Sequence, residues 1–376
     1  MKFTKNILPF IFLLFSIPLN AQKGKVERDI WTVEQANSWY SNQPWLIGAN
    51  FLPSSAINEL EMWQAETFDT VTIAREFKWA ASIGMNTMRI FLHDLAYKQD
   101  PVGFKKRINI LLAIAKRYNI RPLFVLFDSC WDPFPHTGKQ HEPGPFLHNS
   151  GWVQSPGADA LKDSSQYTRL KKYVTDIVAS FNKDKRILGW DVWNEPDNTN
   201  RSSYGRFEPY EKVQLVQNLL GKVFSWTRSA NPSQPITAGI WAGNWKNNDS
   251  LKPIEKLMIE QSDIISFHNY DNGDELEKCI KWMQKYKRPL ICTEYMSRGN
   301  GSTFESSLPV AKKYNIAMIN WGLVNGKSQT IYPWDSWEKK YTSEPELWFH
   351  DIFLKDGTPY KKTEVDFIKE ITGTSK

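Results

Sequence analysis

The sequence predicts an α/β fold of the (β/α)8 TIM barrel type, built as a single domain. Eight short apolar or β-branched runs alternate with longer stretches in which apolar residues recur at three- and four-residue spacing. Strands that alternate with helices indicate a parallel sheet, and eight such units allow the sheet to close on itself so that no edge strand remains. An open doubly wound sheet is the alternative, but no GxGxxG turn or phosphate loop follows any of the runs.

The expected strands and helices alternate along the whole chain. The strands cover residues 45–51, 86–92, 121–127, 187–193, 235–241, 263–269, 288–294 and 316–322. Helical spacing is present over residues 72–84, 105–118, 169–181, 210–228, 275–286 and 361–371. Gly84 and Asn119 are typical of helix ends, and the X-Pro pairs at Pro122 and Pro289 lead into strands. Residues 132–163 form a long irregular insertion after the third strand, and long loops of this kind usually have a function.

The amino terminus has the features of a secretory signal peptide. Two lysines precede an apolar run over residues 7–19, and Ala21 offers a small residue at the cleavage position. We therefore expect residues 1–21 to be a cleavable signal peptide, residues 22–376 to be the folded domain, and the mature protein to be secreted or periplasmic. An uncleaved membrane anchor is the alternative, although this run is shorter than the roughly 20 residues that span a bilayer. No later apolar run reaches that length, so we expect no membrane span in the mature chain.

The composition excludes some partners and suggests others. The formal charge of +6 falls to +4 without the signal peptide, because 45 basic residues then face 41 acidic ones, and this mild charge does not predict a nucleic-acid partner. Cys130, Cys279 and Cys292 have the spacing of neither a zinc site nor a disulfide framework, so we expect at least one buried free thiol. Aromatic residues make up 14% of the chain, with 17 tryptophans, whose flat faces suit sugar rings as well as protein cores.

Polar and aromatic side chains gather at the carboxyl ends of the expected strands, where a barrel carries its chemistry. Taken in strand order from the second to the eighth, they are Arg89, His93 and Asp94; Asp128 and Trp131; Asn194 and Glu195; Trp241; His268 and Tyr270; Glu294; and Trp321. The carboxyl ends of the strands of a barrel meet at one rim, so we expect these groups to converge.

Two of these groups are carboxylates on non-adjacent strands, Glu195 and Glu294. Hydrolysis of a glycosidic bond requires one carboxyl group to protonate the leaving oxygen and a second to act as nucleophile or base, and a separation of about 5 to 5.5 Å allows retention of configuration. The alternative is that each glutamate forms an ordinary buried ion pair. Because this chemistry needs no cofactor, and because His136, His141 and His148 lack a metal-ligand spacing, we expect neither a cofactor nor a metal.

The segments VWNEP (192–196) and ICTEY (291–295) together resemble the pattern of glycoside hydrolase family 5 and the wider clan A, which includes cellulases and mannanases. The resemblance extends over nearly the whole mature chain. It implies that Glu195 is the acid/base, that Glu294 is the nucleophile, and that Asn194 hydrogen-bonds the sugar 2-hydroxyl. The pKa values of the two glutamates are then expected to be pushed apart, as their different roles require.

The same resemblance implies supporting roles for four residues, three of which, Arg89, His268 and Trp321, also have a purely structural alternative in the barrel. Arg89 and Tyr270 are expected to donate hydrogen bonds to Glu294 and keep it ionised. His268 is expected to lie near the acid/base and help set its proton affinity, and Trp321 to form the floor of the subsite that holds the reacting sugar.

The chain departs from the family at the end of the third strand. Family members usually have a histidine there, whereas this chain has FDSCWDP, with Asp128 in that place and Cys130 close by. We expect Asp128 to bind a hydroxyl pair of the substrate or to help hold His93, and we expect Trp131 and Trp241 to contact the substrate.

The function expected from these features is that of a secreted retaining β-glycosidase, which degrades a β-linked oligo- or polysaccharide by double displacement. A transglycosylase with the same mechanism and a carbohydrate-binding barrel whose catalysis has decayed are the alternatives. The long loops after the first, third and eighth strands favour a pocket and exo action over an open groove. The identity of the sugar, the linkage and the oligomeric state are not encoded in any motif of the sequence.

Overall fold

The computed structural model describes residues 1–3, 28–243 and 245–374. The expected signal peptide, residues 1–21, lies almost entirely outside these residues and stays a prediction. Within the described ranges, no helix is both long enough and apolar enough to cross a membrane.

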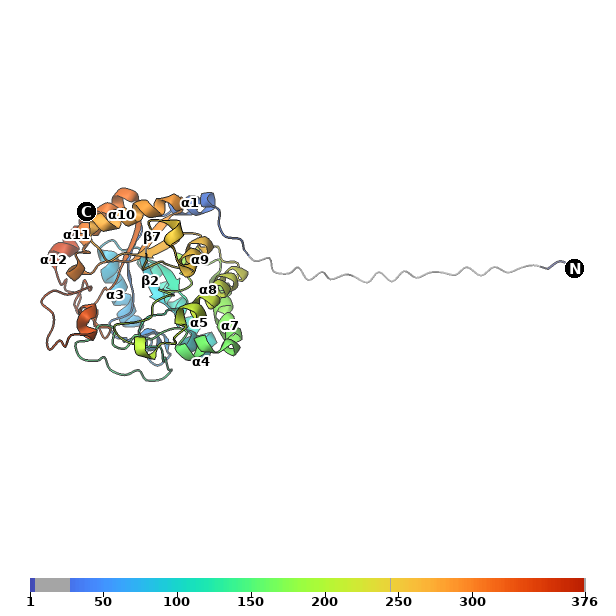
Figure 1. Ribbon diagram of the computed structural model, residues 1–376, viewed down its shortest axis with the longest axis horizontal. Coiled ribbons are helices and arrows are strands. Elements are labelled where there is room, and N and C mark those ends of the chain that lie inside the picture. Colours follow the sequence, from blue (N-terminus) through green and yellow to red (C-terminus); the bar gives the residue numbers. More distant parts are fainter. Residues whose placement is uncertain (4–27, 244, 375–376) are drawn as a thin grey trace.

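Eight parallel strands form the barrel that the sequence predicts, and Figure 1 shows them inside a ring of helices. They are β1 (Ile47–Asn50), β2 (Thr87–Phe91), β3 (Arg121–Val125), β4 (Gly189–Asp191), β5 (Ile236–Thr237), β6 (Ile265–His268), β7 (Leu290–Glu294) and β8 (Ala317–Asn320). Their order in the sheet is β5-β4-β3-β2-β1-β8-β7-β6. Between β5 and β6, Ile240 pairs in parallel with Phe267, and the hydroxyls of Thr237 and Ser266 lie 2.8 Å apart. These contacts close the barrel.

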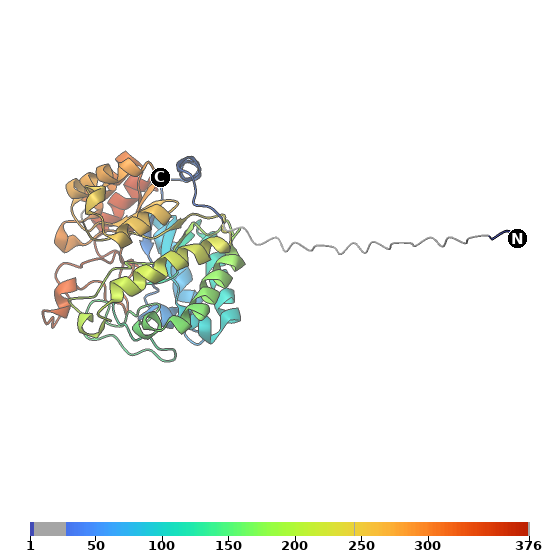
Figure 2. The same cartoon turned by 45° about the vertical axis from the view of Figure 1, so that its right-hand side comes forward.

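Helices cover the outside of the strands, and Figure 2 shows several of them crossing this surface. The helices are α1 (Val33–Ser41), α2 (Glu59–Trp63), α3 (Thr70–Ser82), α4 (Asp94–Gln99), α5 (Pro101–Arg117), α6 (Ala158–Lys162), α7 (Tyr167–Phe181), α8 (Lys212–Ser229), α9 (Pro253–Gln261), α10 (Gly273–Met283), α11 (Phe304–Tyr314) and α12 (Lys362–Thr372). Each helical pattern of the sequence is confirmed as a helix. Gly84 and Asn119 have φ values of 85° and 55° just after α3 and α5, which is the left-handed backbone that ends many helices.

Apolar side chains fill the amino-terminal end of the barrel. They belong to six of the strands or to the residues just before them. The residues are Leu46, Leu123, Leu188, Ile264, Ile291, Ala317 and Ile319. Ala36 of α1 belongs to the same cluster, and Trp31, Trp39 and Tyr40 pack against it. The site residues expected from the sequence lie at the other end, where the strands finish.

The three long segments expected after β1, β3 and β8 are present as connections at that carboxyl end. The segment 132–163 is irregular only as far as Gly157, because its last part forms α6. The expectation of an entirely irregular insertion was therefore wrong at its end. All three cysteines are buried free thiols, which confirms the expectation of at least one.

Candidate active site

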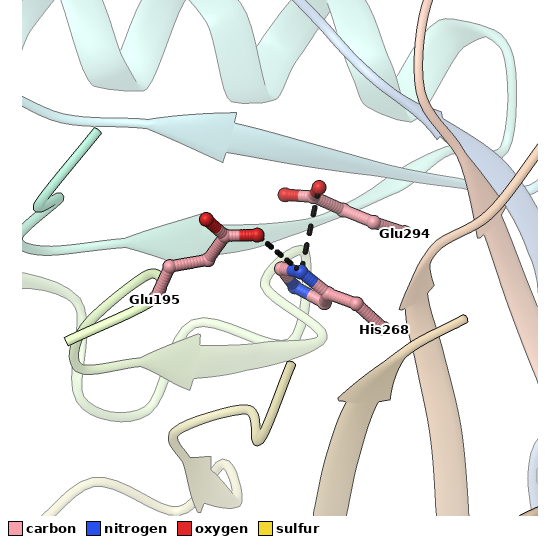
Figure 3. Close-up of side chains that lie close together, drawn as sticks. All are labelled: Glu195, His268 and Glu294. Atoms are coloured by element: carbon pink, nitrogen blue, oxygen red, sulfur yellow. Dashed lines mark hydrogen bonds and ion pairs between the residues drawn. The ribbon is translucent and has the colours of Figure 1, made fainter. Parts of the chain in front are cut away.

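Glu195 and Glu294 meet at the carboxyl end of the barrel (Figure 3). Glu294 is the last residue of β7, and Glu195 follows β4 with a φ of 43°, in the left-handed region. Such a backbone costs of order 1 to 3 kcal/mol in a non-glycine residue and persists where the surrounding structure enforces it. A carboxylate oxygen of each glutamate lies within 4.8 Å of the other. This spacing is close to that of retaining glycosidases and below the roughly 6.5 to 9.5 Å of inverting ones.

Arg89 connects the two halves of the site. Its fully buried guanidinium donates to Glu294 Oε1 at 2.9 Å and to Asn194 Oδ1 at 2.7 Å. The remaining donors reach Asp191 Oδ2, at 3.0 and 2.8 Å, and Asn50 Oδ1, at 3.0 Å. One rigid cation therefore fixes side chains from β1, β4 and β7, and it places positive charge beside Glu294.

Tyr270 holds the second oxygen of Glu294. Its hydroxyl donates to Oε2 at 2.8 Å. Burial, and then the nearby charge of Glu294, raise the pKa of the phenol well above its ordinary value, so the hydroxyl stays a donor near neutral pH. Both oxygens of Glu294 thus accept a hydrogen bond, which orients the carboxylate and favours its charged form.

His268 lies between the two glutamates, as Figure 3 shows. Its Nδ1 is 2.9 Å from Glu195 Oε1 and 3.4 Å from Glu294 Oε2. Burial lowers the pKa of His268 to about 4, so the ring is neutral at neutral pH. The register between β6 and β7 shifts at this point: Phe267 is opposite Cys292, but the next residue, His268, is opposite Glu294 and not Thr293, which brings the ring beside the glutamate.

Cys130 and Asn198 hold the other oxygen of Glu195. The Cys130 thiol donates to Oε2 at 3.1 Å, and Asn198 Nδ2 donates to the same atom at 2.6 Å. Burial, followed by the charges of Asp128 and Glu195, raises the pKa of Cys130 well above its ordinary value, so the thiol keeps its proton.

Burial raises the pKa of both catalytic candidates. For Glu294 it rises to about 6, and the lowering influences of His268, Arg89 and Tyr270 offset only part of the effect. For Glu195 the pKa also rises through burial, against hydrogen bonds from Cys130 and Asn198. The sequence led us to expect two pKa values pushed apart. Both pKa values are raised, because both carboxyls lie in the same desolvated site, and the separation between them stays a prediction.

Glu195, His268 and Glu294 are also close enough to raise the question of a metal, since one atom from each lies within 4.8 Å of the others. The donors around them do not favour a cation. Arg89 and Tyr270 already donate to the two oxygens of Glu294, and a guanidinium 2.9 Å from Oε1 repels a metal ion. The arrangement suits proton transfer and nucleophilic attack, and the expected absence of a cofactor stays a prediction.

A cavity of about 1050 Å³ lies over the two glutamates. Most of the sequence-predicted site residues line it: Trp131, Asn194, Glu195, Trp241, His268, Tyr270, Glu294 and Trp321. Arg89 is fully buried beneath them. Trp321 packs against Phe91 and Trp152, which fixes its ring in the lining of this pocket.

Asp128 does not lie where the sequence analysis expected it, in contact with the substrate. It is 2% exposed and does not line the pocket, because its carboxylate is turned into the protein. It accepts hydrogen bonds from the Cys130 backbone N–H, from Asn194 Nδ2 at 2.9 Å and from Trp152 Nε1 at 2.7 Å. Asp128 therefore orients Asn194 from behind, and neither a substrate hydroxyl nor His93 is its partner in these contacts.

Sequence reasoning missed four residues of the site: Asn50, Asp191, Asn198 and Trp334. A signal existed for two of them. Asp191 is a charged residue inside the apolar run of β4, and Asn50 ends β1 at the same level of the barrel. Asn198 and Trp334 lie on irregular segments, for which no periodicity gives a direction.

A family model described as Cellulase (glycosyl hydrolase family 5) matches residues 146–338, slightly more than half of the chain. The matched span includes Glu195, His268, Glu294 and Trp321. A search of curated proteins found no match.

Several solved structures share the fold. The GH5_18 protein of Streptomyces cattleya in complex with GlcNAc is 10% identical, with a TM-score of 0.57, and the alignment covers 88% of this chain and 79% of that one. The exo-β-1,4-mannosidase Op5Man5 of Opitutaceae bacterium strain TAV5 is 16% identical, with a TM-score of 0.58 and coverage of 87% and 59%. The endo-1,4-β-mannanase of Rhizomucor miehei is 13% identical, with a TM-score of 0.56 and coverage of 88% and 95%. At these identities the likeness concerns the barrel itself.

Proposed function

This chain belongs to the cellulase family, glycosyl hydrolase family 5, and is a glycoside hydrolase; from that premise we propose that it cleaves a β-linked oligo- or polysaccharide with retention of configuration. The observation that carries this proposal is the distance of at most 4.8 Å between carboxylate oxygens of Glu195 and Glu294. That gap accommodates direct attack on the sugar but not the water molecule that an inverting enzyme places between its base and the ring.

In the first step, the Glu294 carboxylate attacks the anomeric carbon while Glu195 donates its proton to the departing glycosidic oxygen. The bond to the leaving group breaks, the alcohol departs, and an α-linked glycosyl ester forms on Glu294. The raised pKa of Glu195 keeps the proton available for this transfer.

In the second step, the Glu195 carboxylate takes a proton from a water molecule, and the oxygen of that water attacks the anomeric carbon. The ester bond to Glu294 breaks and the sugar leaves in the β configuration. Neutral His268, 2.9 Å from Glu195 Oε1, keeps this carboxyl oriented in both steps without competing for its proton.

Asn194 is proposed to recognise the sugar 2-hydroxyl. It lines the pocket, while Arg89 and Asp128 hold its amide oxygen and nitrogen from behind. A hydrogen bond to this hydroxyl strengthens as positive charge develops on the ring, so it stabilises the transition state more than the bound substrate.

Proton NMR during hydrolysis of an aryl β-glycoside tests the mechanism. We expect the β-anomer of the free sugar to appear first and the α-anomer to follow by mutarotation. Initial appearance of the α-anomer would contradict the proposal. Dominant transfer of the sugar to an added alcohol would identify a transglycosylase of the same mechanism.

The sugar itself requires a substrate screen. The solved structures with the same fold include a β-mannosidase and β-mannanases, so aryl β-mannoside and β-1,4-mannan are the first substrates to test, followed by β-glucosides and β-xylosides.

Export through cleavage after Ala21 is the second part of the proposal. It is supported by the pattern of lysines, apolar run and small residue in the first 21 residues. Amino-terminal sequencing of protein recovered outside the cytoplasm should begin at Gln22, and a product that still begins at Met1 would contradict cleavage.

A further inference from the structure

The segments after β3 and β8 are fastened to each other beside the catalytic pocket. We call residues 144–152 and 326–337 the wall. Its hydrogen bonds run from Asn149 N to Ser328 O, His148 N to Ser336 Oγ, Trp337 Nε1 to His148 O, Gln329 Nε2 to Gly144 O and Phe146 N to Gln329 Oε1, at 2.6 to 3.1 Å. These hydrogen bonds join backbone to backbone and side chain to backbone, and both segments contribute side chains to them. Neither segment can therefore move far without the other.

The segment after β1 is also hydrogen-bonded to the wall. Lys327 Nζ lies 2.8 Å from Glu61 Oε1, and Asn58 Nδ2 donates to Gly151 O at 2.8 Å. Asn58 is completely buried, which makes this contact part of the folded core. All three long loops of the barrel therefore form one connected structure.

Aromatic rings fill the wall where it meets the pocket. Trp131 is stacked on Trp337 with ring centres 5.5 Å apart, and His148 lies 5.5 Å from Trp131. Trp334 contacts the edge of Tyr270 at 4.9 Å, next to the nucleophile candidate. Trp131, His148 and Trp334 line the pocket, and we infer that these packed rings close it on this side.

Another part of the pocket lining is charged and exposed. The segments after β4, β5 and β6 line it with Asp197, Arg201, Trp241, Lys246, Lys252 and Asp271. We call these residues the rim. Arg201, Lys246, Lys252 and Asp271 are exposed, in contrast to the buried His148 and Asn149 of the wall. The Trp241 ring is held in place by a hydrogen bond from its Nε1 to Asp197 Oδ1 at 2.7 Å.

The position of Glu195, the proposed acid, determines how the substrate is oriented in this pocket. Glu195 protonates the oxygen of the departing part of the substrate, so that part leaves past Glu195. Asp197 and Asn198 follow Glu195 in the chain and line the same pocket, and Asp197 accepts the hydrogen bond that holds the Trp241 ring of the rim. The departing portion is thus directed to the rim, and the reacting sugar is enclosed by the wall.

We propose that the enzyme is exo-acting: it holds the single non-reducing terminal sugar of a β-linked oligosaccharide against the wall and seats the rest of the chain on the rim, with Trp241 as the stacking surface for the next sugar. This inference rests on the proposed function and adds the class and orientation of the substrate. It gives a structural basis to the pocket that the loop lengths alone suggested.

A product time course tests the orientation. The probes are β-1,4-mannohexaose and cellohexaose, each labelled at the reducing end with 2-aminobenzamide. We expect the first products to be the unlabelled monosaccharide and the labelled pentaose. Early labelled di- or trisaccharides would establish endo action, and an early labelled monosaccharide would reverse the orientation; either result overturns the inference. Failure on these probes and on every aryl β-glycoside would reject the proposed function itself.

Trp241→Ala tests the rim. With the labelled trisaccharide of the active series, we expect kcat/KM to fall about tenfold through lost stacking of the leaving sugar. With the corresponding β-glycosyl fluoride, whose leaving group does not reach the rim, kcat/KM should fall much less. Equal loss on both substrates would overturn the role of Trp241, because it would indicate general damage to the site.

Discussion

The thiol of Cys130 lies 3.1 Å from Oε2 of Glu195 and donates a hydrogen bond to it. The two residues are separated by 65 positions and meet because the ends of β3 and β4 are neighbours in the sheet. A thiol is a weak donor, but the carboxyl group that it contacts is buried. Among the described residues, Asn198 is the only other hydrogen-bond donor to Oε2 of Glu195. It therefore influences when Glu195 gives up its proton.

We predict that Cys130→Ala shifts the alkaline limb of the pH profile of kcat/KM to higher pH. Loss of a donor to the charged carboxylate raises the pKa of Glu195 further, so the acid stays protonated over a wider range. Cys130→Ser, which keeps a hydroxyl donor, should retain a profile close to that of the wild type. Superimposable profiles for wild type and Cys130→Ala would show that the thiol has no influence on this proton.

Glu294→Ala should lower kcat/KM by roughly three orders of magnitude or more on every substrate, since no glycosyl ester can form. Added azide should restore turnover and yield the α-glycosyl azide, detected by NMR. Glu305→Ala, an exposed glutamate of α11, is the matched control and should keep wild-type activity. Absence of the α-azide, with the fold intact by circular dichroism, would remove Glu294 from the role of nucleophile.

Glu195→Ala should affect substrates according to their leaving groups. A dinitrophenyl glycoside needs little acid assistance and should lose much less in its first step than a phenyl or alkyl glycoside. Pre-steady-state kinetics isolates that step. A uniform loss across the series would be inconsistent with Glu195 as the acid.

The acid limb of kcat/KM should follow Glu294. Its carboxyl must be ionised, and burial raises its pKa to about 6, so the rate should decline as the pH falls through that value. Tyr270→Phe removes a donor to the carboxylate and should move this limb to still higher pH. A wild-type limb centred at the ordinary glutamate value of 4.5 would contradict the effect of burial.

Outside the site, Arg298 and Glu364 form a buried ion pair that ties the segment after β7 to α12. Arg298 Nε and Nη2 donate to Glu364 at 2.9 and 2.6 Å. Glu364→Ala leaves the guanidinium without its counter-charge and should lower the free energy of unfolding by about 3 to 5 kcal/mol. Glu370→Ala, exposed on the same helix, should change it by less than about 0.5 kcal/mol. Urea denaturation of both variants measures the difference, and equal midpoints would contradict it.

The sequence by itself determined the barrel and the two glutamates. Apolar runs and three-to-four spacing are local patterns, so all eight strands and six of the helices, α3, α5, α7, α8, α10 and α12, were predicted within a few residues. The same regularity placed Glu195 and Glu294 at the ends of β4 and β7, where the barrel brings them together.

The tertiary structure decided which atoms meet. Closure of the barrel and the register of its strands put Arg89 in contact with Asn50, Asp191 and Glu294, and they turn Asp128 away from the pocket. The wall depends on hydrogen bonds such as that from Trp337 to His148, 189 residues apart. Irregular segments have no repeating sequence pattern, and contacts between distant residues depend on how the chain between them folds. Neither the wall nor the rim of the pocket can therefore be predicted from any single stretch of the sequence.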